Sequence, residues 1–205
     1  MAQKGFYFDS TRCTGCKTCE LACKDYKNLD TPLRLRKVLD IEGGDWTADE
    51  DNAWVTSGFV YHISAACNHC DMPACVAICP VGAIAKNDDN GLVTIDAEIC
   101  IGCGSCLQGC PYNAPKLTVD NIAVKCDGCF DRVSEDKMPI CVESCPLRAL
   151  EFGDIEELRS LYGDTVDIEP LASSRETSPN LVVKTPSFMA DFGSESSLVN
   201  ELETL

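Results

Sequence analysis

The residues that could do chemistry in this chain of 205 residues are its sixteen cysteines. One stretch, residues 100–111, has the C-x2-C-x2-C-x3-C-P spacing of bacterial iron–sulfur proteins. Its first three thiolates can bind three irons of one cubane, whereas the fourth cysteine of such a run ligates the neighbouring cluster in two-cluster ferredoxins. The run therefore predicts an iron–sulfur site and requires a second run elsewhere in the chain.

All the cysteines fall into four groups of four. In chain order the groups are Cys13, Cys16, Cys19 and Cys23; Cys67, Cys70, Cys75 and Cys79; Cys100, Cys103, Cys106 and Cys110; and Cys126, Cys129, Cys141 and Cys145. The first group has the spacing of the third, the second is two residues wider, and the fourth contains an eleven-residue insert. Three groups continue as Cys-Pro-x-x-Ala, to Ala83, Ala114 and Ala149. The cysteines thus form an internal repeat.

Disulfides and zinc are the alternatives for so many cysteines. A disulfide-rich secreted protein is expected to begin with a basic and then apolar signal, whereas residues 1–6 lead directly into a strand-like segment. Zinc sites need only two C-x2-C pairs and do not require a triple run followed by x3-Cys-Pro. The spacing therefore favours iron–sulfur clusters over both.

The composition excludes two other classes of protein. A formal charge of −16 argues against nucleic-acid binding, because phosphates require a basic surface. Each oxidised cluster with four thiolates adds a charge of about −2, so four clusters would lower the total to roughly −24. No run of eighteen apolar residues is present, so no membrane span is expected.

Short strands and helices are expected around the cysteines. Residues 5–9 and 92–96 read as strands that each end in Asp-x3-Cys, and we expect Asp9 and Asp96 to form turns with their side chains. Helical patterns cover residues 20–28 and 154–162, the second with an acidic first turn and Gly163 as its stop.

The expected fold is α+β, with two pseudo-symmetric units like bacterial ferredoxins, short antiparallel strands, short helices, an insertion and an extended C-terminal tail. The boundaries are residues 1–24 with 125–153 for the first unit, 25–66 for the insertion, 67–124 for the second unit, and 154–205 for a helix and tail. The insert at 130–140 should be a surface helix or loop, since it is charged.

The insertion and the tail carry less specific signals. The insertion should have a turn-rich centre at residues 42–46 and strands at 54–55 and 59–63, with Trp46 and Trp54 as packing residues. The tail, residues 164–205, is rich in Ser, Pro and acidic residues, and either disorder or an extended conformation on a partner is open. His69 is expected to pack or to support a cluster rather than to ligate iron, because the thiolates already complete the ligand sets.

Several stretches resemble one family of iron–sulfur proteins. The chain is similar, from residue 5 to about residue 160, to the iron–sulfur electron-transfer subunit of anaerobic dimethyl sulfoxide reductase, within the four-cluster ferredoxin subunits of molybdopterin oxidoreductases. The stretches that carry the resemblance are residues 13–26, 43–46, 67–70, 125–129 and 140–150. The cysteine frame is shared by the broader family, so it specifies the subunit type better than the substrate.

The resemblance implies four [4Fe-4S] clusters with crosswise ligation. The implied ligand sets are Cys13, Cys16, Cys19 and Cys145 for cluster 1; Cys23, Cys126, Cys129 and Cys141 for cluster 2; Cys67, Cys70, Cys75 and Cys110 for cluster 3; and Cys79, Cys100, Cys103 and Cys106 for cluster 4. Some related nitrate reductases have tryptophan at the position of Cys103 and hold a three-iron cluster, whereas the cysteine here implies a cubane.

The resemblance also implies partners and a non-catalytic role. The subunit would relay electrons from an integral membrane quinol-oxidising subunit, through cluster 4, to a molybdopterin catalytic subunit that reduces dimethyl sulfoxide or a similar oxide, through cluster 1. The complex would lie peripherally on the cell membrane, on either side, and any export would use the partner's signal. The alternatives are a subunit of another molybdoenzyme or hydrogenase, acting on formate, thiosulfate, polysulfide or tetrathionate, and a free polyferredoxin.

Overall fold

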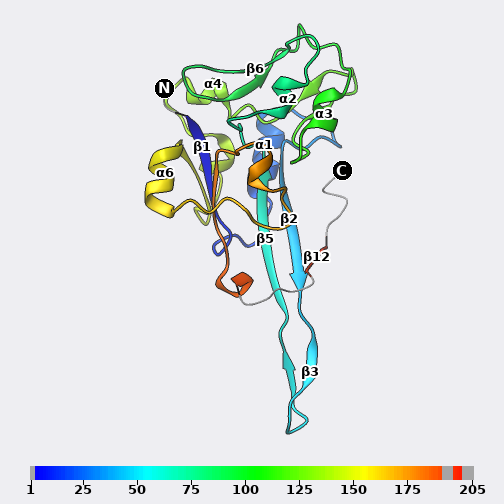
Figure 1. The fold of residues 1–205 in the computed structure, drawn as a ribbon, viewed down its shortest axis with the longest axis vertical. Coiled ribbons are helices and arrows are strands. Elements are labelled where there is room, and N and C mark those ends of the chain that lie inside the picture. Colours follow the sequence, from blue (N-terminus) through cyan, green and yellow to red (C-terminus); the bar gives the residue numbers. More distant parts are fainter. Residues whose placement is uncertain (1–2, 191–195, 200–205) are drawn as a thin grey trace.

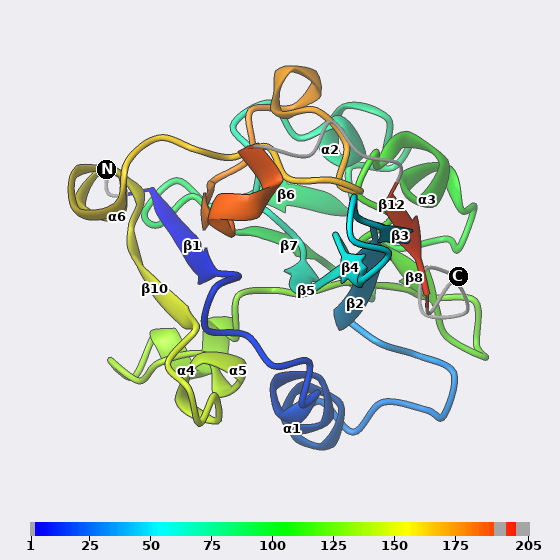
Figure 2. The ribbon, with the colours of Figure 1, turned by 90° about the horizontal axis from the view of Figure 1, so that it is seen from below.

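The central sheet of the protein joins the two ends of the first expected unit. The computed structural model describes residues 3–190 and 196–199. In it, β1 (Lys4–Asp9) lies between β10 (Leu150–Asp154), which is antiparallel to it, and β11 (Leu181–Lys184), which is parallel. Figure 2 shows β1 beside β10, so the segment that leads into the first cysteine group lies next to the segment that leaves the fourth.

Both faces of β1 are covered. Phe6 and Phe8 point into the main core, where the Phe6 ring lies 4.9 Å from that of Phe152. Tyr7 points to the other face and stacks on Tyr162 of α6 (Ile155–Tyr162) at a ring distance of 3.8 Å. The strand predicted for this segment is thus confirmed, and it is buried on two sides rather than one.

The two longer helices agree with the sequence. Helix α1 (Thr18–Tyr26) contains the residues expected to be helical except the last two. Helix α6 begins after Asp154, whose Oδ1 accepts hydrogen bonds from the backbone N–H groups of Glu156 and Glu157, and it ends at Gly163. Within the described residues, no helix is both long and apolar enough to span a membrane.

A second sheet forms a long ribbon beside the first. Strand β2 (Arg36–Gly43) pairs antiparallel with β5 (Phe59–Ala66) along its full length, and β12 (Ser196–Leu198) pairs with the outer edge of β2. Strand β5 was predicted in part, whereas β2 was not. The turn-rich centre predicted at residues 42–46 is wrong, because Glu42 and Gly43 end β2 and the backbone only bends before it continues.

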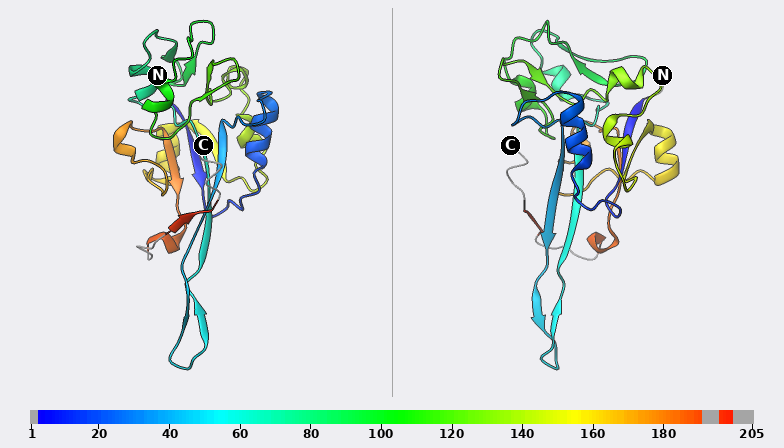
Figure 3. Two further views of the ribbon diagram at one scale, coloured as in Figure 1. Left: turned by 90° about the vertical axis from the view of Figure 1, so that its right-hand side faces the viewer. Right: turned by 180° about the vertical axis from the view of Figure 1, so that it is seen from behind.

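Beyond this bend the ribbon continues as a hairpin that projects from the body (Figure 1, Figure 3). It consists of β3 (Trp46–Ala48) and β4 (Trp54–Thr56). Its reversal is stabilised by Asp49, whose Oδ1 accepts hydrogen bonds from the backbone N–H groups of Asp51 and Ala53. Trp46 and Trp54 are 62% and 70% exposed, so the prediction that they are packing residues is wrong.

The remaining elements are short and surround the cysteines. They are α2 (Ala74–Ala77), β6 (Ile84–Lys86), β7 (Val93–Ile95), α3 (Ser105–Gly109), β8 (Lys116–Leu117), β9 (Ala123–Val124), α4 (Phe130–Val133), α5 (Ile140–Glu143) and two 3-10 helices, Ser174–Glu176 and Ser187–Ala190. Helix α1 packs on α5 and α2 on α3, while β6 pairs with β7 and β8 with β9. Contacts therefore link residues 1–24 to 125–153 and gather residues 67–124, and the division into two units stays a prediction.

The described part of the tail packs on the body of the protein. Val182 and Val183 of β11 are buried, and so is Ile168. Neither disorder nor an extended conformation on a partner, the two states left open, describes these residues. The rest of the tail prediction concerns residues 191–195 and 200–205, which lie outside the described residues.

Candidate iron–sulfur cluster sites

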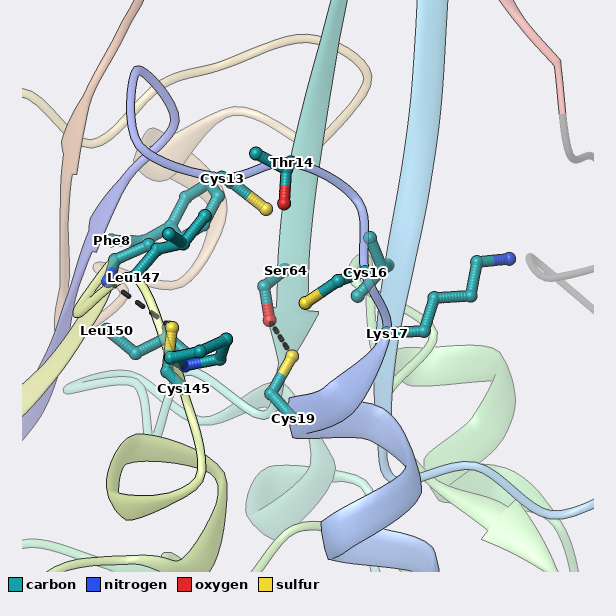
Figure 4. Close-up of a pocket in the computed structure, with 13 residues that line it drawn as sticks. Phe8, Cys13, Thr14, Cys16, Lys17, Cys19, Ser64, Cys145, Leu147 and Leu150 are labelled. Carbon is teal, nitrogen blue, oxygen red and sulfur yellow. Dashed lines mark hydrogen bonds between the residues drawn. The ribbon is translucent and has the colours of Figure 1, made fainter.

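Four cysteines from two distant segments line one pocket, here called site 1 (Figure 4). They are Cys13, Cys16, Cys19 and Cys145. In Figure 4 their sulfur atoms point into a common space, with Phe8 and Leu150 among the apolar side chains around it. The structure therefore brings together the set that the resemblance implies for cluster 1.

The local backbone positions these sulfurs. Gly15 has a φ of 67°, and a Cβ there would lie 2.7 Å from the ring of His62, so the loop requires glycine. Cys19 lies in the first turn of α1, and its Sγ is 3.3 Å from the hydroxyl of Ser64 on β5. Cys145 follows α5, and its Sγ accepts a hydrogen bond of 3.3 Å from the backbone N–H of Ala149.

A second pocket, here called site 3, belongs to the other unit. Its cysteines are Cys67, Cys70, Cys75 and Cys110. Thr177 from the tail donates its hydroxyl to Cys70 Sγ at 3.1 Å, and Lys125 also lines the pocket. The set again matches the one implied for its cluster.

Within each of the other two sets, the cysteines also lie near one another. Site 2 contains Cys23, Cys126, Cys129 and Cys141, and site 4 contains Cys79, Cys100, Cys103 and Cys106. Burial, with smaller contributions from the nearby Cys141 and Cys129, raises the pKa of the Cys23 thiol to about 12. Burial also raises the pKa of Cys106, with smaller contributions from the other three cysteines of site 4. Such electrostatic contributions require short separations between the sulfurs.

The chemistry of these sites fits an iron–sulfur cluster better than a single ion. All sixteen cysteines are free thiols. Among the described residues, no three His, Cys, Asp or Glu side chains are placed to hold one metal ion, whereas four cysteines line each of the pockets of sites 1 and 3. Burial raises the pKa of Cys75 to about 12. Iron would deprotonate such a thiol on binding, and protons would be released.

Two cysteines approach the surface. Cys16 of site 1 and Cys103 of site 4 are the exposed members of the sixteen. Each lies 3.4 Å from a hydroxyl two residues later, that of Thr18 and that of Ser105. Hydrogen bonds from these residues lower the pKa of both thiols. The two loops are therefore equivalent in local structure as well as in sequence.

His69 supports the sites without joining a ligand set. Its ring is fully buried, and Nδ1 accepts a hydrogen bond of 2.9 Å from the backbone N–H of Val93. The ring proton is therefore on Nε2, which lies 4.0 Å from Cys126 Sγ of site 2. In the sequence His69 lies between Cys67 and Cys70, which are two cysteines of site 3. The predicted supporting role is confirmed.

The two aspartates that precede the cysteine runs form turns, as predicted. The Oδ1 atom of Asp9 accepts the backbone N–H of Thr11 at 3.0 Å, and that of Asp96 accepts the backbone N–H of Glu98 at 2.9 Å. The charged insert after Cys129 begins with the short exposed helix α4, which is also as predicted.

Several residues that hold the sites together were not predicted. Asn180 is fully buried, and its Nδ2 donates to the backbone carbonyl of His69 at 2.8 Å and to Asp71 Oδ1 at 3.0 Å. Arg36 is buried on β2 beside sites 1 and 2. Neither has a spacing signal, because the partner of each lies far away in the sequence.

The fold and the four cysteine sets define a ferredoxin-like iron–sulfur protein that carries four [4Fe-4S] clusters. A family profile described as a 4Fe-4S dicluster domain matches residues 59–155, and one described as a 4Fe-4S binding domain matches residues 10–26.

Curated proteins narrow the class to one family. The chain is 52% identical over 183 residues to the B subunit of the anaerobic dimethyl sulfoxide reductase of Escherichia coli (strain K12), and the match covers 89% of this chain and 88% of the relative. It is equally identical to the protein of the same name from Haemophilus influenzae, over 90% of both. It is 34% identical to the nitrate-inducible formate dehydrogenase iron-sulfur subunit of Escherichia coli, over 75% of this chain and 55% of the relative. The chain belongs to the family of iron–sulfur B subunits of anaerobic dimethyl sulfoxide reductases.

Proposed function

We propose that this protein is the non-catalytic electron-transfer subunit of a complex that lies on the cell membrane and reduces dimethyl sulfoxide or a similar oxide. A membrane quinol-oxidising subunit would supply the electrons, and a molybdopterin catalytic subunit would receive them. When bound, each [4Fe-4S] cluster accepts and releases one electron. The ligand sets proposed are those of sites 1 to 4.

The observation that carries the proposal is the exposure of one cysteine in each of two sites. Cys16 of site 1 and Cys103 of site 4 are exposed, whereas every cysteine of site 2 is buried. An interior site between two sites that approach the surface suits a path from one partner to another. A free carrier of electrons would need only one such exposed site.

The surface around site 4 supports a membrane subunit as its partner. Ile78 and Val81 flank Cys79, and Ile99 and Ile101 flank Cys100, and all four side chains are exposed. Ile101 is 64% exposed. Exposed apolar side chains gathered around one site indicate an interaction surface. We therefore assign site 4 to the quinol-oxidising partner and site 1 to the catalytic partner.

The non-catalytic role follows from the use of the thiols. The four proposed ligand sets employ all sixteen cysteines, and the ring proton of His69 faces Cys126. In this proposal the thiols, which are the strongest nucleophiles of the protein, are therefore committed to the clusters.

Isolation of the complex from membranes tests the proposal. The affinity-tagged protein should retain a molybdenum-containing protein and a membrane protein, and the complex should reduce dimethyl sulfoxide with a quinol analogue. A tagged protein that carries clusters but retains no molybdenum would contradict the proposal and favour a free polyferredoxin.

A further inference from the structure

The projecting hairpin of β3 and β4 is exposed to solvent along its whole length. Every residue from 44 to 58 is exposed, although this stretch contains both tryptophans of the protein. The register pairs Trp46 with Thr56 and Ala48 with Trp54, so both indoles lie on one face of the two-stranded sheet. An isolated two-stranded hairpin is marginally stable in water, and tryptophan is enriched at protein interfaces. The exposed indole face is therefore suited to contact another protein.

The charge of this segment selects the kind of partner. The segment 42–60, here called the arm, contains five acidic residues, and the sequence has no Lys or Arg from residue 38 to residue 85. At the bend a groove is lined by Glu42, Asp45 and Trp46. Two carboxylates beside an indole suit a guanidinium or ammonium group, through ion pairing and cation–π contact. An anionic lipid surface would be repelled by the same charges.

The position of the arm indicates which of the two proposed partner subunits it contacts. Val38 of β2 and Ser64 of β5 line site 1, and the same two strands continue into the arm. In Figure 1 and Figure 3 the arm extends away from α2, α3 and β6, which surround site 4. At about 3.3 Å per residue, the arm extends roughly 35 Å beyond Val38. A protein bound over site 1 is thus within its reach, and one bound over site 4 is on the opposite side.

We propose that the arm docks in a basic groove on the catalytic subunit and that the groove takes up both indoles. This assignment rests on the function proposed above. It is tested with the tagged holo-complex and the double variant Trp46→Ala with Trp54→Ala. We expect at least tenfold weaker retention of the molybdenum-containing subunit, with unchanged iron content and unchanged retention of the membrane subunit.

Three further variants sharpen the test. Replacing both tryptophans with Phe should restore most of the retention, because an aromatic ring still fills the groove. Neutralising the tip with Asp49→Asn, Glu50→Gln and Asp51→Asn should weaken retention less, and mostly at low salt. Leu161→Ala is the matched control, since Leu161 is 71% exposed on α6, and it should have no effect.

Carbodiimide cross-linking identifies the protein that the arm contacts. Cross-links from Glu50 or Asp51 should lead to lysines of the molybdenum-containing subunit. Cross-links to a second copy of this chain or to the membrane subunit, or full retention by the double Ala variant, would overturn the docking proposal while molybdenum in the wild-type complex still supports the proposed function. Absence of molybdenum from the wild-type complex would contradict both.

A different observation carries a second inference, which concerns Arg36. This side chain is 2% exposed, and its Nη1 donates to the carbonyl and the hydroxyl of Ser64, both at 3.1 Å. Its Nε and Nη2 are buried without a hydrogen-bond partner. The guanidinium carbon lies 4.8 Å from the centre of the Phe6 ring. A buried cation with unsatisfied donors is costly unless negative charge lies beside it.

The negative charge beside Arg36 belongs to two cluster sites. The guanidinium interacts electrostatically with four nearby thiols, which are Cys19 of site 1 and Cys23, Cys126 and Cys141 of site 2. The hydroxyl of Ser64 contacts both the guanidinium and Cys19 Sγ, which fixes the cation next to site 1. With clusters bound, the two sites would carry charges of about −2 each. These charges would stabilise the buried guanidinium of Arg36 and its unpaired N–H donors.

We infer that Arg36 is a positioning residue that raises the reduction potentials of clusters 1 and 2. Each reduction adds one electron, supplied by the donor subunit, to a site that is already negative, and a fixed buried cation stabilises the added charge. Cluster 4 serves as the internal control, because none of its cysteines is among the main groups that act on Arg36 or lines the pocket beside Arg36, whereas Cys67 of site 3 lines that pocket.

Redox titration of the holoprotein, followed by electron paramagnetic resonance, tests this inference. In Arg36→Gln the ratio of reduced to oxidised cluster 1 or 2 should fall at least tenfold at fixed potential, which equals a shift of about 59 mV for one electron. Cluster 4 should not shift, and the potentials of clusters 1 and 2 should shift less in Arg36→Lys, which keeps the charge, than in Arg36→Gln. Unchanged potentials, an equal shift of all four clusters, or loss of clusters 1 and 2 from both variants would overturn the inference, the last because it indicates a purely structural role.

Discussion

The two ends of the protein use the same loop in different surroundings. Cys16 and Cys103 are both exposed, and both sulfurs lie 3.4 Å from a hydroxyl two residues later. In site 4, Ile99 and Ile101 on either side of Cys100 are exposed, Ile101 by 64%. Beside Cys16, Lys17 pairs with Asp40 at 3.9 Å. The repeated loop therefore accounts for an exposed cysteine in each of the two sites, and the side chains beside the two loops differ.

The hydrophobic cores of the two units differ as well. The first unit shares a large core with both three-stranded sheets. The core of the second unit has five buried residues, two of which, Cys75 and Cys106, are cysteines. The second unit therefore depends more on its clusters, because small cores provide little stability alone.

Removal of iron should have the largest effect. The holoprotein should contain about sixteen irons and sixteen acid-labile sulfides, as four cubanes require. Chelation should abolish cooperative thermal unfolding, because metal binding supplies folding free energy. Hydrogen exchange during chelation should show loss of protection in residues 67–124 before residues 4–9 and 150–154. Simultaneous loss would show that the two units do not differ in this respect.

Replacement of Cys145 by Ser tests the crosswise sets. Because Cys145 lies with Cys13, Cys16 and Cys19, the paramagnetic signal of that cluster should change or convert to a three-iron signal. The signals of the other three clusters should persist. A change confined to the cluster of Cys126, Cys129 and Cys141 would contradict the proposed ligand sets.

The two glycines that flank Cys103 in site 4 should differ in their tolerance of a methyl group. A Cβ on Gly102 would lie 1.9 Å from the backbone oxygen of Asn121, whereas one on Gly104 would meet nothing within 4 Å. Gly102→Ala should therefore cost about 2–4 kcal/mol of unfolding free energy. Gly104→Ala should cost about 1 kcal/mol, since Lys17 adopts the equivalent left-handed conformation in the first unit. Chemical denaturation under anaerobic conditions measures both, and equal costs would contradict this account.

The smallest effect is expected for Tyr7→Phe. Burial first, and then the neighbouring Asp9 carboxylate, raise the pKa of Tyr7 to about 12. A raised pKa gives a contribution to stability that is complete below pH 10 and is lost as the pH rises towards 12. At pH 7 the variant should lose less than about 1 kcal/mol, the net value of one hydrogen bond. Between pH 10 and 12 the wild type should lose up to about 2 kcal/mol more than the variant. Parallel losses would contradict the assignment of this shift to Tyr7.

The cysteine spacing predicted the chemistry of this protein because cluster binding constrains local sequence. The loop from Cys13 to Cys23 and that from Cys100 to Cys110 have the same spacing, and the strands before them were predicted correctly. The cap of α6 at Asp154 was also predictable, since capping depends on a few adjacent residues.

What the sequence did not reveal depends on contacts between distant residues. Strand β11 pairs with β1, which lies about 175 residues earlier, and Thr177 donates a hydrogen bond to Cys70. The sequence of neither segment indicates which distant residues it contacts. Burial of Arg36 could not be expected from its charge. The exposure of Trp46 and Trp54 was missed because large aromatic side chains are usually buried, and a surface that serves a partner has the composition of a core.

Quinol-driven reduction of the complex with Cys103→Ser tests the central claim most directly. We predict that this variant, with site 4 impaired, loses turnover driven by a quinol analogue, while turnover driven by an artificial donor to the catalytic subunit persists. Cys16→Ser should leave quinol able to reduce the cluster of site 4 but should prevent turnover of substrate. Unchanged quinol-driven turnover in Cys103→Ser, with the three other clusters intact, would show that site 4 does not lie on the path and would contradict a route from one end of the subunit to the other.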